Sequence, residues 1–183
     1  DRAHTQQGYV RNTPILRTEI TDANGARVEI LDFCPRYRQF GRLYRPLAFV
    51  RLIRPRAGTP RIRIKLRPMI DYGATHAGTT AGSNHVRYVG GETTLRLTTD
   101  GPVGHILDER VFRLEEPLTL FLGPDEGFDS DVTSTTRRML RETTDYWRHW
   151  VRTLSVPLEW QAAVIRSAIT LKLCAHEDTG AIV

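Results

Sequence analysis

The C-terminal part of the chain carries the feature that most restricts its fold, a long helical pattern. Apolar residues recur there at three- and four-residue steps, as on one face of an α-helix: Met139, Leu140, Tyr146, Trp147, Trp150, Val151 and Leu154. This helix is predicted to end at Ser155. Ser155 is suited to cap a new helix, and Pro157 fits a first helical turn, where its missing N–H would have no partner.

The second helix is expected to run to about Ala175, and its apolar residues cover more than one stripe. They are Trp160, Ala163, Val164, Ala168, Ile169, Leu171, Leu173 and Cys174. A helix with so broad an apolar surface is packed on most sides. One further helix cannot bury it, so we expect additional helices from outside this chain to pack against it.

The region before these helices has the pattern of short strands separated by turns. The expected strands are a hairpin over 13–35, a pair of 47–53 with 61–69, a hairpin of 86–89 with 94–98, and strands at 103–107, 111–114 and 118–122. The glycine-containing segment 75–84 is expected to be an exposed, mobile loop. Many short strands with a turn after each indicate an antiparallel β-sandwich, so the predicted fold class is mainly β.

These two patterns divide the chain into three parts. We predict a β-sandwich domain over 1–122 that is incomplete at its N-terminus, a linker over 123–136, and a helical segment over 137–183. The linker contains four carboxylates, which could suit calcium: Asp125, Glu126, Asp129 and Asp131. Their spacing lacks the EF-hand pattern, so we interpret them as solvated residues near the positive end of a helix and expect no metal.

Charge and composition favour a globular protein. The net charge is +5, 40% of the residues are hydrophobic and 26% are charged. Almost all the positive charge is arginine, and over 61–67 the basic residues alternate with Ile62, Ile64 and Leu66, which predicts the solvent face of a half-buried strand rather than a nucleic-acid site. No run of about 18 apolar residues occurs, so no membrane insertion is expected.

The two cysteines and the first residue bear on the origin of the chain. Cys34 and Cys174 are far apart, have no zinc-like spacing and lie in apolar stretches, so we predict buried free thiols. Reduced thiols favour a cytoplasmic protein. Because the chain opens at Asp1 and ends within an element, we expect it to be an internal piece of a longer protein.

Individual residues offer little chemistry by themselves. Asp32 could be catalytic, but a strand-end carboxylate before Pro35 more often accepts backbone hydrogen bonds in a turn. Tyr72 could present its ring to a sugar, but we expect it to pack over a strand end beside Gly73. His176, with Glu177 and Asp178, could approach a pocket, although a surface or capping position is the simpler interpretation. No metalloprotease, serine-hydrolase or phosphate-loop motif occurs, and we expect no cofactor.

Several motifs together resemble a known family. The pattern YWRHW, followed after about a dozen residues by RSAITLKLCAHEDTGAIV, resembles the start of the catalytic helical barrel in glycoside hydrolase family 15, the bacterial glucoamylase and trehalase-like enzymes. Weaker points of resemblance are the Asp-Phe-x-Pro pattern at 32–35, the strand YVRNTPILRTEI before it, and the Pro-x-x-x-Tyr-Gly segment at 68–73.

The resemblance implies a supersandwich-like β domain joined to an (α/α)6 barrel that lies mostly outside this chain. It implies an inverting hydrolase that releases glucose from an α-linked glucoside or glucan. In the family both catalytic glutamates lie beyond the position of Val183, so no catalytic or substrate-binding residue is expected here. The chain would support the barrel, with Trp147, Trp150 and Trp160 as anchors of the interdomain contact.

Two other functions stay open on the residues alone. One is a free-standing carbohydrate-binding β-sandwich without catalysis, and the other is an arginine-rich nucleic-acid-binding domain. The broad apolar second helix favours the glycosidase, because a complete binding module would not end on an unpaired helix. The preferred glucoside and the number of subunits cannot be inferred from the residues.

Overall fold

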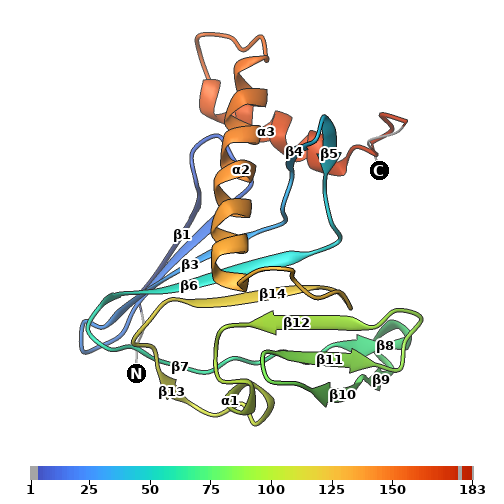
Figure 1. Ribbon diagram of the computed structural model, residues 1–183. Coiled ribbons are helices and arrows are strands. Elements are labelled where there is room, and N and C mark those ends of the chain that lie inside the picture. Colours follow the sequence, from blue (N-terminus) through green and yellow to red (C-terminus); the bar gives the residue numbers. More distant parts are fainter. Residues whose placement is uncertain (1–3, 177–178, 183) are drawn as a thin grey trace.

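The computed structural model describes residues 4–176 and 179–182, and its body is an antiparallel sheet of eight strands (Figure 1). The strands, in their order across the sheet, are β1 (His4–Tyr9), β2 (Leu16–Thr21), β3 (Arg27–Phe33), β6 (Phe49–Ala57), β14 (Leu118–Pro124), β12 (Leu95–Thr99), β11 (His85–Val89) and β10 (Gly78–Ala81). The mainly β prediction is therefore confirmed.

Small elements surround this sheet. They are the pairs β4 (Tyr37–Gln39) with β5 (Arg42–Tyr44), β7 (Arg61–Ile62) with β13 (Phe112–Arg113), and β8 (Met69–Ile70) with β9 (Thr75–His76), the 3-10 turn η1 (Asp71–Gly73), and the helices α1 (Val103–Leu107), α2 (Val132–Arg152) and α3 (Gln161–Cys174). No helix among the described residues combines the length and the apolar character that crossing a bilayer requires.

The first predicted hairpin is confirmed as β2 and β3. The Asp22 carboxylate accepts the backbone N–H groups of Asn24 and Ala26 at 2.8 and 2.9 Å, and Gly25 adopts a φ of 82°. A side chain that satisfies turn amides and a glycine at positive φ are what a tight reversal of the backbone requires. The hairpin of β11 with β12 is confirmed in the same way by its antiparallel register.

The predicted pairing of 47–53 with 61–69 is wrong. Strand β6 lies in the centre of the sheet between β3 and β14, whereas β7 pairs with β13. Pro55 does not bracket a turn but lies within β6, where the register with β3 shifts. A bulge at an irregular register accommodates a residue that has no N–H to donate. Residues 61–67 do alternate between exposed and half-buried, as predicted, although regular strand structure ends at Ile62.

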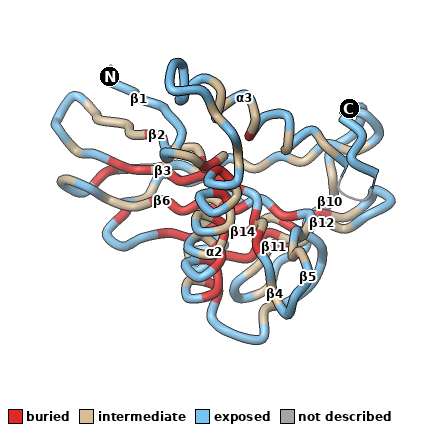
Figure 2. Tube along the Cα trace, turned by 90° about the horizontal axis from the view of Figure 1, so that it is seen from above, coloured by how far each residue is buried: buried red, intermediate tan, exposed pale blue. Residues whose placement is uncertain are grey.

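Each face of the sheet has its own core, because alternate residues of a strand point to opposite sides. On one face Leu31, Val50, Leu52 and Phe121 pack with Met139 of α2. Figure 2 shows α2 over the buried stretches of the central strands. The opposite face packs against α1, and the half-buried side chains of Ile62, Ile64, Leu66 and Phe112 cover it. The second layer on that side is thus a narrow one, built from β7, β13 and the extended chain after Ile62.

Three short segments differ from the sequence prediction. The segment 103–107 is helical rather than a strand, because Pro102 begins a single turn whose Ile106 is buried against the sheet. The segment 75–84 contains the exposed strands β9 and β10 instead of a loop. The stretch 37–44, where no strand is expected from the sequence, contains a tight hairpin of β4 and β5, with Phe40 and Gly41 at positive φ.

Helix α2 begins at Val132, five residues before the position expected from the apolar pattern. Asp131 caps it by accepting the N–H of Ser134 at 2.7 Å, and this bond lowers the pKa of the Asp131 carboxyl below its ordinary value. The polar linker is correspondingly shorter than 123–136. Its first residues, Gly123 and Pro124, belong to β14.

Helix α3 begins at Gln161, so Ser155 and Pro157 do not start it. Trp160 occupies the N-cap position at a φ of 61°, and its side chain makes no capping hydrogen bond. The residues between Arg152 and Gln161 therefore form a non-helical connection. In Figure 1 the C-terminal half of α2 extends beyond the sheet, and α3 crosses it there.

Candidate functional site

The contact between α2 and α3 is built around Trp147, which is fully buried. Its neighbours in this small core are Val151 of α2 and Ile169 of α3, which are also buried. The rings of Tyr146 and Trp150 meet Trp147 edge to face at centroid distances of 5.6 and 5.5 Å. Edge-to-face geometry places the positive ring edge on a negative ring face, which adds to the gain from burial.

Two arginines fix the helices to the sheet domain. The guanidinium of Arg166 donates to the backbone oxygen of Thr13 at 2.6 Å and lies 3.9 Å from the centroid of the Tyr9 ring. Arg36 lies 5.5 Å from the Trp147 ring centroid, and its backbone N–H donates to the hydroxyl of the buried Thr143 at 3.1 Å. Neither arginine was singled out from the sequence, because both contacts join residues more than 100 positions apart.

The rest of α3 is open. Within Gln161–Cys174, Ile169 alone is buried, while Leu171 and Leu173 are 54% and 49% exposed. Trp160, in the connection before the helix, is 79% exposed. The described residues therefore pack against one side of a helix whose apolar residues face several sides, and the other sides meet solvent.

The three tryptophans consequently occupy different environments. Trp147 is buried, Trp150 is half-buried with the Lys172 ammonium 5.3 Å from its ring centroid, and Trp160 is largely exposed. Their assignment as interdomain anchors stays a prediction. Within the described residues, Trp147 joins α2 to α3, and the exposed ring of Trp160 is free to contact further chain.

A cleft of about 500 Å³ lies beside this core, between α2, β4 and α3. Its lining combines aromatic and ionisable side chains: Tyr37, Arg38, Glu142, Asp145, Tyr146, His149, Trp150, Thr153 and Lys172. The aromatic faces already have partners, because Arg36 approaches the Tyr146 ring and Lys172 the Trp150 ring. A polar ligand here would therefore meet hydrogen-bonding groups rather than a free stacking platform.

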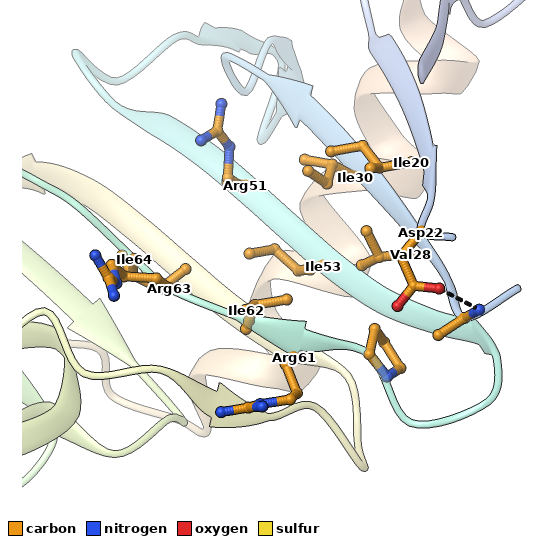
Figure 3. Close-up of a pocket in the computed structure, with 12 residues that line it drawn as sticks. Ile20, Asp22, Val28, Ile30, Arg51, Ile53, Arg61, Ile62, Arg63 and Ile64 are labelled. Carbon is orange, nitrogen blue, oxygen red and sulfur yellow. Dashed lines mark hydrogen bonds between the residues drawn. The ribbon is translucent and has the colours of Figure 1, made fainter. Parts of the chain in front are cut away.

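A second groove, of about 300 Å³, lies between the sheet and the segment 60–64 (Figure 3). Ile20, Ile30, Ile53 and Ile62 supply an aliphatic lining. Asp22 and Arg51, at the margins, already have partners in the hairpin turn and in Asp32. The groove thus offers apolar surface and no side-chain pair for acid–base chemistry.

Asp32 has a structural role, but not the one predicted. Its two carboxylate oxygens accept from Nε and a terminal nitrogen of Arg51 at 2.7 and 2.9 Å, across the β3–β6 register. This bidentate bond raises the pKa of Arg51 further above its ordinary value. Asp32 therefore stabilises a strand pair and does not accept turn amides.

The predictions for Tyr72 and for the two cysteines are wrong. Tyr72 does not pack over a strand end, because its side chain is fully exposed at a φ of 55°, whereas Gly73 takes the predicted positive φ. Cys34 and Cys174 are free but exposed, so the buried-thiol prediction is wrong. Cys34 lies between the buried Phe33 and Pro35, whereas Cys174 lies on the open side of α3 beside the half-exposed Leu173.

His176 lies at the surface, where its Nδ1 is 3.0 Å from the Thr179 hydroxyl, while Glu177 and Asp178 lie outside the described residues. Of the linker carboxylates, Asp131 caps α2 and Asp125 binds Arg87 at 2.8 Å. Among residues 4–176 and 179–182, no group of three or more histidine, cysteine or acidic side chains could hold a metal ion.

Comparison with known proteins gives one distant similarity. No family model matches the chain, and no solved structure matches it. A curated trehalase of Thermoplasma volcanium is 26% identical over 189 aligned positions, which cover 98% of this chain. The chain spans 29% of the length of that protein. The similarity supports a relationship to a trehalase-like glycosidase.

Proposed function

We propose that this chain is the non-catalytic N-terminal portion of an inverting α-glucosidase of glycoside hydrolase family 15, of glucoamylase or trehalase type. The catalytic (α/α)6 barrel would follow the last residues of the chain, and α3 would be its first helix. The substrate would be an α-linked glucoside or glucan held by that barrel. The sheet domain would support the barrel and contribute no catalytic residue.

The observation that carries this proposal is the extent of the trehalase similarity. The alignment runs over 98% of the chain and so includes the sheet, α2 and α3 together. An isolated carbohydrate-binding module would align over the sheet alone. Because the alignment covers 29% of the trehalase, most of that protein has no counterpart here. The chemistry is therefore sought in the part that follows.

The open surface of α3 supports the same arrangement. Leu171 and Leu173 are about half exposed, and Trp160, which directly precedes α3, is largely exposed. Burying apolar surface contributes about 25 cal/mol per Å². Packing these side chains against further helices would stabilise both parts, which gives the sheet domain a physical means of supporting a barrel.

The carboxylates of the sheet fit a supporting role better than a catalytic one. Inverting hydrolysis needs one carboxylic acid to protonate the leaving oxygen and one carboxylate to activate water on the opposite face of the sugar. Asp32 binds Arg51, and the buried Glu29 contacts Arg17 and Arg56. Arginine partners occupy the oxygens of both carboxylates and hold them in place, so neither is free to contact a sugar.

The proposal is tested by glucose release from trehalose, maltose and a longer α-glucan, measured with the full-length protein. We expect release from at least one of them, and the preferred substrate distinguishes trehalase from glucoamylase. With the longer α-glucan as substrate, proton NMR of the glucose released first should show the β anomer, because inversion changes the configuration at the attacked carbon. Asp32→Asn removes the buried carboxylate near the end of β3. It should leave the turnover number within a factor of about three of the wild-type value.

Three results would contradict the proposal. The absence of hydrolysis with all three substrates would remove the glucosidase assignment. Initial formation of α-glucose from the longer α-glucan would exclude inversion. Hydrolysis that vanishes in a folded Asp32→Asn variant would place the chemistry within this chain instead of after it.

A further inference from the structure

A further groove, separate from the two described above, lies along α2 and is lined by arginines that come from two elements. Its lining consists of Arg54 of β6 and of Arg137, Leu140, Arg141, Thr144, Asp145 and Arg148 of α2, and its volume is about 360 Å³. We call it the arginine groove. It lies on a different side of α2 from the cleft beside Trp150, and Asp145 lines both.

Helix geometry brings the three arginines of α2 into line. Arg141 and Arg148 follow Arg137 by 4 and 11 residues, which are close to whole numbers of turns at 3.6 residues per turn. The three side chains therefore leave one narrow sector of the helix, and Arg141 lies between the other two along the helix axis. Arg54 reaches the same groove from the sheet, so guanidinium groups approach it from two directions.

The positive charge of the arginine groove is poorly balanced. Among the described residues, the ion pairs include none with Arg137, Arg141 or Arg148. Arg54 lies 3.6 Å from a Glu29 oxygen, but Glu29 also contacts Arg17 and Arg56. One carboxylate, Asp145, therefore faces four arginines in the lining.

Folding does not require this arrangement. Like charges four residues apart on a helix, as at Arg137 and Arg141, repel each other and destabilise the helix slightly. Both side chains are exposed, so neither fills the core. An anion in the groove would turn this repulsion into a binding contribution. Guanidinium forks match the oxygens of phosphate in pairs and stay charged at every physiological pH.

We propose that the arginine groove binds a phosphate group, either as inorganic phosphate or as the phosphomonoester of a small molecule such as a hexose. Thr144 contributes little to the contact, because its hydroxyl donates to the Leu140 carbonyl at 2.6 Å. Asp145 at one margin would repel a long polyanion that ran past the groove, which favours a compact ligand. The argument rests on this groove alone and is independent of the glucosidase proposal.

The test is isothermal titration calorimetry of the full-length protein with inorganic phosphate and with glucose 6-phosphate, in chloride buffer of matched ionic strength. We expect saturable binding of at least one probe. Arg137→Gln combined with Arg141→Gln should weaken it roughly tenfold or more, since each charge-assisted contact is lost. Arg141→Lys keeps the charge without the fork and should give an intermediate loss. The matched control is Arg152→Gln on the same helix, outside the groove, which should bind as wild type.

The two probes and the control give distinct outcomes. Equal affinity for both probes identifies the phosphate group itself as the ligand, and tighter binding of glucose 6-phosphate identifies a phosphorylated sugar. The proposal is overturned if neither probe binds above the chloride background, or if Arg152→Gln loses as much affinity as the double variant. Binding of RNA or heparin without binding of either small probe would also overturn it. Melting curves in chloride establish that each variant is folded.

Discussion

At the scale of single residues, the pair of Asp32 and Arg51 carries the clearest consequence. We expect Asp32→Asn to lower the free energy of unfolding by about 1–3 kcal/mol, because the Arg51 guanidinium loses a charged bidentate acceptor. Urea denaturation of the full-length protein measures this. The double variant Asp32→Asn with Arg51→Gln should be destabilised by less than the sum of the two single variants, since both remove the same contact. Strictly additive losses would show that the two side chains do not interact.

The role of Asp32 could be predicted from the sequence, but its partner could not. The sequence predicts a structural Asp32, but it suggests turn amides as the partners because Pro35 follows closely. Arg51 becomes the partner because β3 and β6 are neighbours and Asp32 lies opposite Arg51 in their register. A pairing between strands that are not joined by a short turn cannot be inferred from one sequence. The type of role was therefore predictable, and the partner was not.

At the scale of elements, the junction of α2 with α3 depends on one side chain. We expect Trp147→Ala to lower the melting temperature by about 10 °C, because removing a buried aromatic costs roughly 3–5 kcal/mol. Trp150→Ala should cost clearly less, since Trp150 is only half-buried and Trp147 is not exposed at all. Differential scanning calorimetry compares the two. Equal losses, or a larger loss at Trp150, would contradict this account of the junction.

The boundaries of the elements were less predictable than their existence. The apolar steps after Met139 reveal α2, but its first turn, Val132–Thr136, contains three threonines, and β-branched residues favour strands over helices. The Asp131 cap and the burial of Thr135 and Thr136 decide the start of the helix instead. The run Val103–Leu107 is too short for periodicity to separate a strand from a helical turn.

At the scale of the whole molecule, the open side of α3 distinguishes a supporting domain from a free-standing one. We expect Leu171→Ala in the full-length protein to cost about 2 kcal/mol or more, because further helices would bury this side chain. The matched control is Leu107→Ala in α1, which lies at the opposite end of the molecule from α3 and is exposed to a similar degree (Figure 1). It should cost about 1 kcal/mol or less.

Thermal unfolding of the two leucine variants checks this prediction, and equal small losses would mean that nothing covers α3. That further helices cover α3 stays a prediction, which rests on the apolar residues on several sides of this helix. The arginine groove was not anticipated. Arg54 belongs to it only because β6 lies beside α2, and a single sequence does not show that neighbourhood.

The order of strands in the large sheet also governs when the chain can fold. Its two central strands, β6 and β14, are separated by the 60 residues 58–117, and β14 ends at Pro124. Until the ribosome has released that residue, β6 exposes one unpaired edge. The core under α2 then lacks Phe121, and the core on the opposite face lacks Leu120. Closing so long a loop precedes the gain from pairing, which makes the step slow relative to local hairpins. The strands up to β6 therefore wait, with an open strand edge, for β14 to be synthesised.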